Sequence, residues 1–314
     1  FPGIKERNWI WNEATQDYFY ATFYPQQPDL NWDNPEVVES MLANMDFWAD
    51  RGVDGFRLDA ALTLIKRDGT VSRGLPETHA VLKHIRAHLD AQYNGTIALL
   101  AEAHLEVEEI KKFFGNGDEC HLVYHFPLAE RLPFALMRKD PNLLQDILTR
   151  SENIPPGCEW AVFVRNHDEL SLATLSKSER AELLAAFNAP PEYLFNKGSS
   201  AALRLADMFR HDPERIRDMI ALLYTMPGVP ILYYGDEIGM HNMPENGAID
   251  AREYVRGPFD WHEAHRAMND PNSLWHQIAH IIRNKPSSLH RLIARIFGFP
   301  LTDAEETIPP TPQQ

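Results

Sequence analysis

The chain has 314 residues, and its 30 lysines and arginines face 45 aspartates and glutamates, so the formal charge is −15. This acidic excess repels phosphate backbones and anionic lipid headgroups, which argues against nucleic acid or a membrane as a partner and leaves neutral substrates open. The apolar share of 44% and the aromatic share of 11% are typical of a globular chain that buries a real core.

Aromatic, β-prone segments open the chain. Residues 8–11 and 18–23 flank a polar stretch, and this pattern predicts a β-hairpin. Residues 33–36 (Asp-Asn-Pro-Glu) supply an Asx-type cap followed by a proline, which predicts the start of a helix. Gly52 is expected to end that helix.

Short apolar runs alternate with helical patterns after Gly52. Strands are predicted at residues 53–58, 96–101, 122–126, 160–164 and 229–234. Helices are predicted at residues 77–92, 107–114, 128–138, 143–150, 178–187 and 213–224. Strands that alternate with helices are typical of parallel β/α units.

Three of the predicted strands end in acidic residues. Period-2 alternation places Arg57 and Asp59 on one face at the end of the first strand, while Glu102 follows the second. His167 and Asp168 follow the fourth. In a (β/α) barrel, the side chains at the carboxyl ends of the strands form the functional site.

Two interpretations of these charges compete. In the structural one, Arg57 neutralises Asp59 in an ion pair and each acid caps a helix. The functional one gains weight because three strand ends of one parallel sheet carry a carboxylate, and charges at the exits of buried strands are costly unless they are paired or used. Two carboxylates across a cleft, one a nucleophile and the other a general acid about 5 Å away, are the requirement of retaining glycoside chemistry.

Several motifs in register resemble the α-amylase family of glycoside hydrolases. Residues 55–60 (Gly-Phe-Arg-Leu-Asp-Ala), 101–103 (Ala-Glu-Ala), 165–169 (Arg-Asn-His-Asp-Glu) and 233–239 (Tyr-Tyr-Gly-Asp-Glu-Ile-Gly) resemble its motifs at barrel strands four, five, seven and eight. Residues 27–31 (Gln-Pro-Asp-Leu-Asn) resemble the marker of the oligo-1,6-glucosidase and trehalose synthase branch. The resemblance covers roughly residues 5 to 290.

The resemblance implies an α/β fold, a (β/α)8 TIM-type barrel that is present only in part, as about strands four to eight with their helices. It implies that residues 1–32 are the end of the subdomain inserted between barrel strand three and helix three. Residues 33–293 are expected to form the C-terminal part of the catalytic barrel. Residues 294–314, rich in proline and glutamine, are expected to be a disordered tail. We therefore expect the chain to be N-terminally incomplete.

The resemblance also implies roles for five residues. Asp59 is the nucleophile that forms a covalent β-glucosyl-enzyme, and Glu102 is the general acid and then the base. Asp168 stabilises the transition state by binding sugar hydroxyls, while Arg57 and His167 orient the nucleophile and the sugar. The physical logic agrees, because neighbouring carboxylates favour a protonated Glu102 and Arg57 favours an ionised Asp59.

The expected function is that of a retaining α-glucosidase or glucosyl-transferring enzyme acting on maltose-type α-glucosides. Hydrolysis and isomerisation of the trehalose synthase type both stay open, as does the oligomeric state. The alternative is an inactive or incomplete amylase-like fragment or a non-catalytic binding module, against which the presence of Asp59, Glu102 and Asp168 argues. No cofactor is expected. Many relatives bind calcium, partly through segments that this sequence lacks.

Other clusters have simpler interpretations. His79, His84 and His88 lie on one predicted helix without an HExxH pattern, so we expect a solvated helix face and no metal. Arginines alternate with acids over residues 204–217, which predicts a salt-bridged surface. The hairpin aromatics are expected to pack on the barrel rim rather than line a sugar cleft.

Two further features bear on environment. Cys120 and Cys158 cannot build a disulfide framework and are expected to be reduced thiols. The longest apolar run, residues 220–235, is short for a membrane span of about 20 residues and contains two prolines. No signal peptide is visible after Phe1, and we expect a cytoplasmic location.

Two interpretations of Asp236 remain. Its side chain either belongs to the active site or caps the loop after the last strand.

Overall fold

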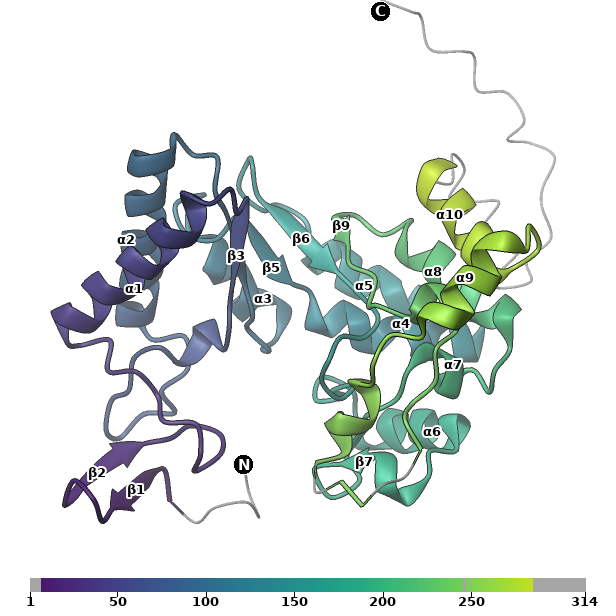
Figure 1. The fold of residues 1–314 in the computed structure, drawn as a ribbon, viewed down its shortest axis with the longest axis horizontal. Helices are drawn as coiled ribbons and strands as arrows, with labels where there is room; N and C mark the ends of the chain where they lie inside the picture. Colours follow the sequence, from purple (N-terminus) through teal and green to yellow (C-terminus); the bar gives the residue numbers. More distant parts are fainter. Residues whose placement is uncertain (1–6, 245–246, 249, 285–314) are drawn as a thin grey trace, which may run out of the picture. The chain divides into compact units, whose positions relative to one another are not determined.

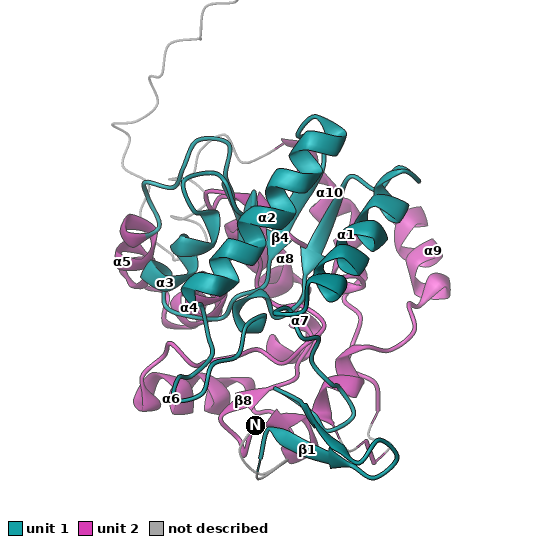
Figure 2. Ribbon diagram, turned by 90° about the vertical axis from the view of Figure 1, so that its left-hand side faces the viewer, with its two compact units in different colours: residues 1–124, 151–161 teal, residues 125–150, 162–314 magenta. Residues whose placement is uncertain are grey.

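The computed structural model describes residues 7–244, 247–248 and 250–284. The chain divides into two compact units (Figure 2). Unit 1 comprises residues 1–124 and 151–161, and unit 2 comprises residues 125–150 and 162–314. The predicted tail at residues 294–314 lies outside the described residues.

Unit 1 begins with the predicted hairpin. Strands β1 (Trp9–Asn12) and β2 (Asp17–Tyr20) pair antiparallel, with Trp9 opposite Tyr20 and Trp11 opposite Tyr18. The paired rings pack edge to face, with centroids 5.2 and 5.0 Å apart. Cross-strand aromatic pairs of this kind stabilise a short hairpin.

Parallel strands alternate with helices in the rest of unit 1 (Figure 1), as predicted. The strands pair in the order β3 (Gly55–Leu58), β4 (Ala98–Ala101), β5 (Leu122–Tyr124) and β6 (Glu159–Val162). Val162, the last residue of β6, already belongs to unit 2. The helices are α1 (Pro35–Ala49), α2 (Pro76–Tyr93) and the single turn α3 (Val107–Ile110). In α1 the Asn34 side chain accepts a hydrogen bond from the Glu36 N–H, which confirms the predicted cap.

Helices predominate over strands in the described part of unit 2. Its helices are α4 (Phe126–Arg138), α5 (Asn142–Arg150), α6 (Lys177–Phe187), α7 (Leu205–Met208), α8 (Pro213–Leu223), α9 (Trp261–Asn269) and α10 (Leu274–Asn284). Its short strands are β7 (Leu194–Phe195), β8 (Ser200–Ala201) and β9 (Val229–Pro230). Just after β9, the Ile231 N–H donates a hydrogen bond to the Val162 carbonyl at 2.8 Å. Among the helices that the structure describes, none has the length and apolar character that crossing a membrane requires.

All five predicted strands are longer than the strands that form, and the last three of them end earlier than predicted. The strand predicted at 122–126 ends at Tyr124, because the His125 side chain accepts a hydrogen bond from the Leu128 N–H and so caps α4, with Pro127 in its first turn. The strand predicted at 229–234 forms only at Val229–Pro230. Helices α9 and α10 and the β7–β8 pair were not predicted.

The prediction of a salt-bridged surface over residues 204–217 is wrong for Arg204, which is fully buried. Its guanidinium donates hydrogen bonds to the carbonyl oxygens of Tyr234, at 2.7 Å, and Val255, at 2.8 Å. Asp236, also buried, has its Oδ1 4.0 Å from the same guanidinium. Of the two interpretations of Asp236, its burial beside Arg204 favours the role in holding the loop after β9.

Both cysteines are buried in unit 1 and neither forms a disulfide. The Cys158 sulfur lies 3.7 Å from the carbonyl oxygen of Cys120, close to the pairing of β5 with β6. Burial raises the pKa of Cys120 to about 12 and also raises that of Cys158. Both thiols are therefore held in their neutral form at physiological pH.

Candidate active site

Arg57 and Asp59 meet at the carboxyl end of β3. Their side chains share one face, as the alternation predicts, and Arg57 Nη1 lies 2.6 Å from Asp59 Oδ1. The Asp59 side chain is 78% exposed, whereas that of Arg57 is 29% exposed. The carboxylate is thus paired on one side and open to solvent on the other.

Glu102, just past the end of the neighbouring strand β4, joins this pair. Arg57 Nη2 lies 2.6 Å from Glu102 Oε2, so one guanidinium bridges acids from two adjacent strands. The Ala60 N–H donates to the same Glu102 oxygen at 3.1 Å. Ala60 has a φ of 45°, in the left-handed region that a non-glycine residue rarely adopts.

Burial sets the proton affinity of Glu102. Loss of solvent raises the pKa of this carboxyl to about 7, although Arg57 and the Ala60 N–H favour its charged form. Asp59 raises it further by repulsion. A carboxyl with this pKa is substantially protonated near neutral pH, whereas an ordinary glutamate is not.

Tyr124 is a neighbour of this cluster that the motifs do not indicate. It ends β5, the strand next to β4, and burial raises the pKa of its hydroxyl while Arg57 lowers it. Its position at the end of the next parallel strand was a usable signal, since strand ends of one sheet carry the site.

A cavity of about 460 Å³ lies against the Arg57–Asp59 pair in unit 1. Four aromatic side chains are among its lining residues, namely Phe23, Trp32, Trp48 and Phe56. Phe23 therefore lines a cavity, against the expectation that the aromatics of this region pack only on the barrel rim. The hairpin rings at Trp9, Trp11, Tyr18 and Tyr20 instead pack on one another.

Asp168 and His167 come together in unit 2. Asp168 Oδ1 lies 2.5 Å from Arg256 Nη2 and 3.3 Å from Arg252 Nη1, and Asp168 Oδ2 lies 3.4 Å from His167 Nε2. The Asn166 side chain accepts a hydrogen bond from the Asp168 N–H at 2.9 Å. Two guanidinium groups thus contact the Asp168 carboxylate. The sequence pattern predicts no role for Arg252 or Arg256.

The histidines of α2 differ from the prediction of a solvated face, which is confirmed only for His84, an exposed residue. His79 Nδ1 lies 2.7 Å from a carboxylate oxygen of the buried Glu119. His88 Nε2 lies 2.9 Å from Asp46 Oδ1, which links α2 to α1. These two histidines serve packing within unit 1.

A family model described as the α-amylase catalytic domain matches residues 3–196. The chain is 41% identical over 265 residues to a trehalose synthase/amylase of Mycolicibacterium smegmatis, an alignment that covers 83% of this chain and 44% of the relative. It is 41% identical over 261 residues to a trehalose synthase of Thermus thermophilus, covering 83% of this chain and 27% of the relative. The chain thus spans less than half the length of these curated relatives.

Solved structures of the same family share the fold. The chain matches sucrose 6F-phosphate phosphorylase from Thermoanaerobacter thermosaccharolyticum with a TM-score of 0.72 and 21% sequence identity, covering 89% of this chain and 60% of that one. An identity this low concerns the fold alone. Together with the family match, it shows that the parallel strands and helices described above are part of a (β/α)8 barrel.

Proposed function

Since the chain belongs to the α-amylase family, we propose that it carries the catalytic acids of a retaining enzyme that hydrolyses or transfers the glucosyl group of maltose-type α-glucosides. The observation that carries this proposal is the Arg57 bridge. One guanidinium contacts the exposed Asp59 and the buried Glu102, each at 2.6 Å, and the pKa of Glu102 is raised to about 7. One acid is thereby suited to attack and the other to donate a proton.

The first half of the reaction uses both acids at once. The Asp59 carboxylate attacks the anomeric carbon and forms an ester, while the bond from that carbon to the leaving oxygen breaks. Glu102 gives its proton to the leaving oxygen and becomes a carboxylate. Arg57 then neutralises Glu102 in this new charged state.

The second half reverses these roles. The Glu102 carboxylate takes a proton from water or from a sugar hydroxyl, and the resulting oxygen attacks the anomeric carbon. The ester to Asp59 breaks and its carboxylate is restored, so the α configuration is retained after two inversions. We assign to Asp168, held by Arg252 and Arg256, the binding of sugar hydroxyls in the transition state, and to His167 a supporting contact.

Azide distinguishes the two acids. With α-glucosyl fluoride and azide, D59A is expected to yield β-glucosyl azide, because the anion replaces the missing nucleophile in a single inversion. E102A is expected to yield α-glucosyl azide, because azide attacks the glucosyl-enzyme. Equal turnover of an aryl α-glucoside by D59A and the parent would refute the assignment.

A matched control exists in unit 1. Arg67 bridges Asp33, at 2.7 Å, and Glu77, at 3.0 Å, on the surface. The D33N and E77Q variants remove acids from the same kind of bridge and are expected to keep the parental rate and product.

The products from maltose decide between the two reaction types. Glucose alone identifies a hydrolase, whereas trehalose identifies an isomerase that retains the released glucose and returns the glucosyl group to it. The names of the two trehalose synthase relatives favour the isomerase. Binding of maltose without any turnover would instead identify a non-catalytic module.

A further inference from the structure

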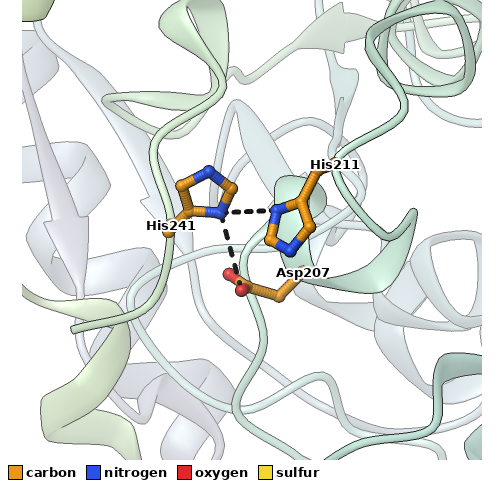
Figure 3. Close-up of side chains that lie close together, drawn as sticks. All are labelled: Asp207, His211 and His241. Atoms are coloured by element: carbon orange, nitrogen blue, oxygen red, sulfur yellow. Dashed lines mark hydrogen bonds and ion pairs between the residues drawn. The ribbon is translucent and has the colours of Figure 1, made fainter. Parts of the chain in front are cut away.

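Three side chains converge in unit 2 outside the residues assigned above: Asp207 of α7, His211 in the turn before α8, and His241 after the loop that follows β9 (Figure 3). His211 Nδ1 lies 2.9 Å from His241 Nδ1, and His241 Nδ1 lies 3.6 Å from Asp207 Oδ1. One ligand atom from each of the three lies within 4.8 Å of the other two. The histidines are exposed, so the site is reachable from solvent.

We propose that Asp207, His211 and His241 bind a divalent transition-metal ion of the zinc class. Two imidazole nitrogens and a carboxylate oxygen are ligands that such an ion prefers, and three protein ligands leave a fourth position for water. Two nitrogens that share a tetrahedral zinc ion stand about 3.3 Å apart, given bonds of about 2.0–2.1 Å. The 2.9 Å between the two Nδ1 atoms is brought to that spacing by a small rotation of exposed rings.

A second set of contacts fixes the carboxylate. Asp207 Oδ2 accepts a hydrogen bond from the Asn242 N–H at 2.7 Å, which leaves Oδ1 directed at His241. The Asn242 side chain is buried, where it accepts from the Arg204 N–H and donates to the Ala202 carbonyl, both at 2.8 Å. Partners that orient a ligand in this way are typical of metal sites.

The backbone that presents His211 is unusual. Arg210 and His211 have φ angles of 52° and 65°, two successive non-glycine residues in the left-handed region. Each such residue costs about 1–2 kcal/mol. The His211 N–H donates to the Ala206 carbonyl at 2.7 Å, and this bond helps to hold the turn.

Bound metal would connect two segments 30 residues apart in sequence. One is the turn between α7 and α8, and the other is the start of the stretch that leads along the chain to Arg252 and Arg256. The ion would therefore hold the turn before α8 and the chain at His241 together within unit 2. The expected role is therefore structural, and the site differs from the proposed catalytic acids.

Calorimetric titration of the full chain with zinc chloride, after treatment with a chelator, tests the proposal. The parent is expected to bind one equivalent tightly. H211Q and H241Q are expected to weaken that equivalent by at least about 10- to 100-fold, since even partners of ligands contribute that much. D207N is also expected to weaken zinc binding. Its amide oxygen can still accept the hydrogen bond from the Asn242 N–H, so the local structure is kept.

The H84Q variant is the control, because His84 is an exposed helical histidine outside the proposed site. This variant is expected to bind the same single equivalent of zinc as tightly as the parent. Zinc is expected to raise the melting temperature of the parent and of H84Q but not of H241Q, whereas magnesium and calcium, which prefer oxygen ligands, raise none of them. Matching metal-free melting curves would show that the variants fold. Zinc binding in both H211Q and H241Q that is as tight as in the parent would overturn the proposal. Asp207, His211 and His241 would then be only a group of side chains in polar contact. Neither readout depends on glycosidase activity.

Discussion

Glu102 combines burial with contact to Arg57, and its raised pKa has a kinetic consequence. As the proposed general acid it acts only when protonated, so the rate falls as the pH rises through about 7. We expect this alkaline limb in kcat/KM for a glucoside with a poor leaving group. With α-glucosyl fluoride, whose leaving group needs little protonation, the limb should be weak. Identical limbs for the two substrates would contradict the role of Glu102.

The Arg57 guanidinium contacts two acids at once through two different nitrogens. A lysine has one ammonium nitrogen in place of this planar fork and does not reproduce the geometry. R57K is therefore expected to lower kcat about 100-fold, since small displacements of reacting groups have effects of that size. The alkaline limb should move to higher pH, because an ammonium that no longer reaches Glu102 lowers the pKa of this acid less than Arg57 does.

R67K is the matched control for this change, because Arg67 bridges two surface acids and is expected to keep both kcat and the pH profile. Equal kinetics for R57K and R67K would show that the Arg57 bridge is only structural.

Among the elements, the pairing of β3 with β4 places Arg57 and Glu102 side by side, and Gly55 permits it. A Cβ at Gly55 would lie 2.6 Å from the Ala98 carbonyl oxygen, a backbone atom that cannot move aside without breaking the strand pair. G55A is expected to lower the free energy of unfolding by more than about 2 kcal/mol, measured in urea.

The comparison for Gly55 is Gly52, which has a φ of 89° and no atom within 4 Å of an added Cβ. G52A carries only the conformational cost of about 1 kcal/mol. A loss in G55A no larger than that in G52A would mean that the close approach of β3 and β4 is not required.

Local patterns predicted the elements whose signals are contiguous. Alternation placed Arg57 beside Asp59, and the Asx-type cap marked the start of α1. The end of β5 was misjudged because a side-chain cap at His125 decided it against an apolar run. Arg204 was misassigned because its partners are backbone carbonyls 30 and 51 residues away, which a charge pattern does not reveal.

For the whole molecule, the charge of −15 has a measurable consequence. A neutral glucoside gains nothing from the field of the protein, so its kcat/KM should change by less than about twofold between low and high salt. A 6-phosphorylated glucoside is repelled, and any rate it shows should rise with salt as the repulsion is screened. A strong salt dependence for the neutral substrate would contradict this account.

The buried thiols at the β5–β6 pairing give the chain an internal reporter of its own opening. Cys120 and Cys158 are the only cysteines in the sequence, and burial raises the pKa of both. A thiol reagent can reach them only when this part of unit 1 opens. At low reagent concentration, where reclosing outpaces the reaction, their modification rate therefore reports the local opening equilibrium. A cysteine introduced on the surface would react with such a reagent far faster than Cys120 or Cys158. It could therefore be labelled selectively while both native cysteines are kept.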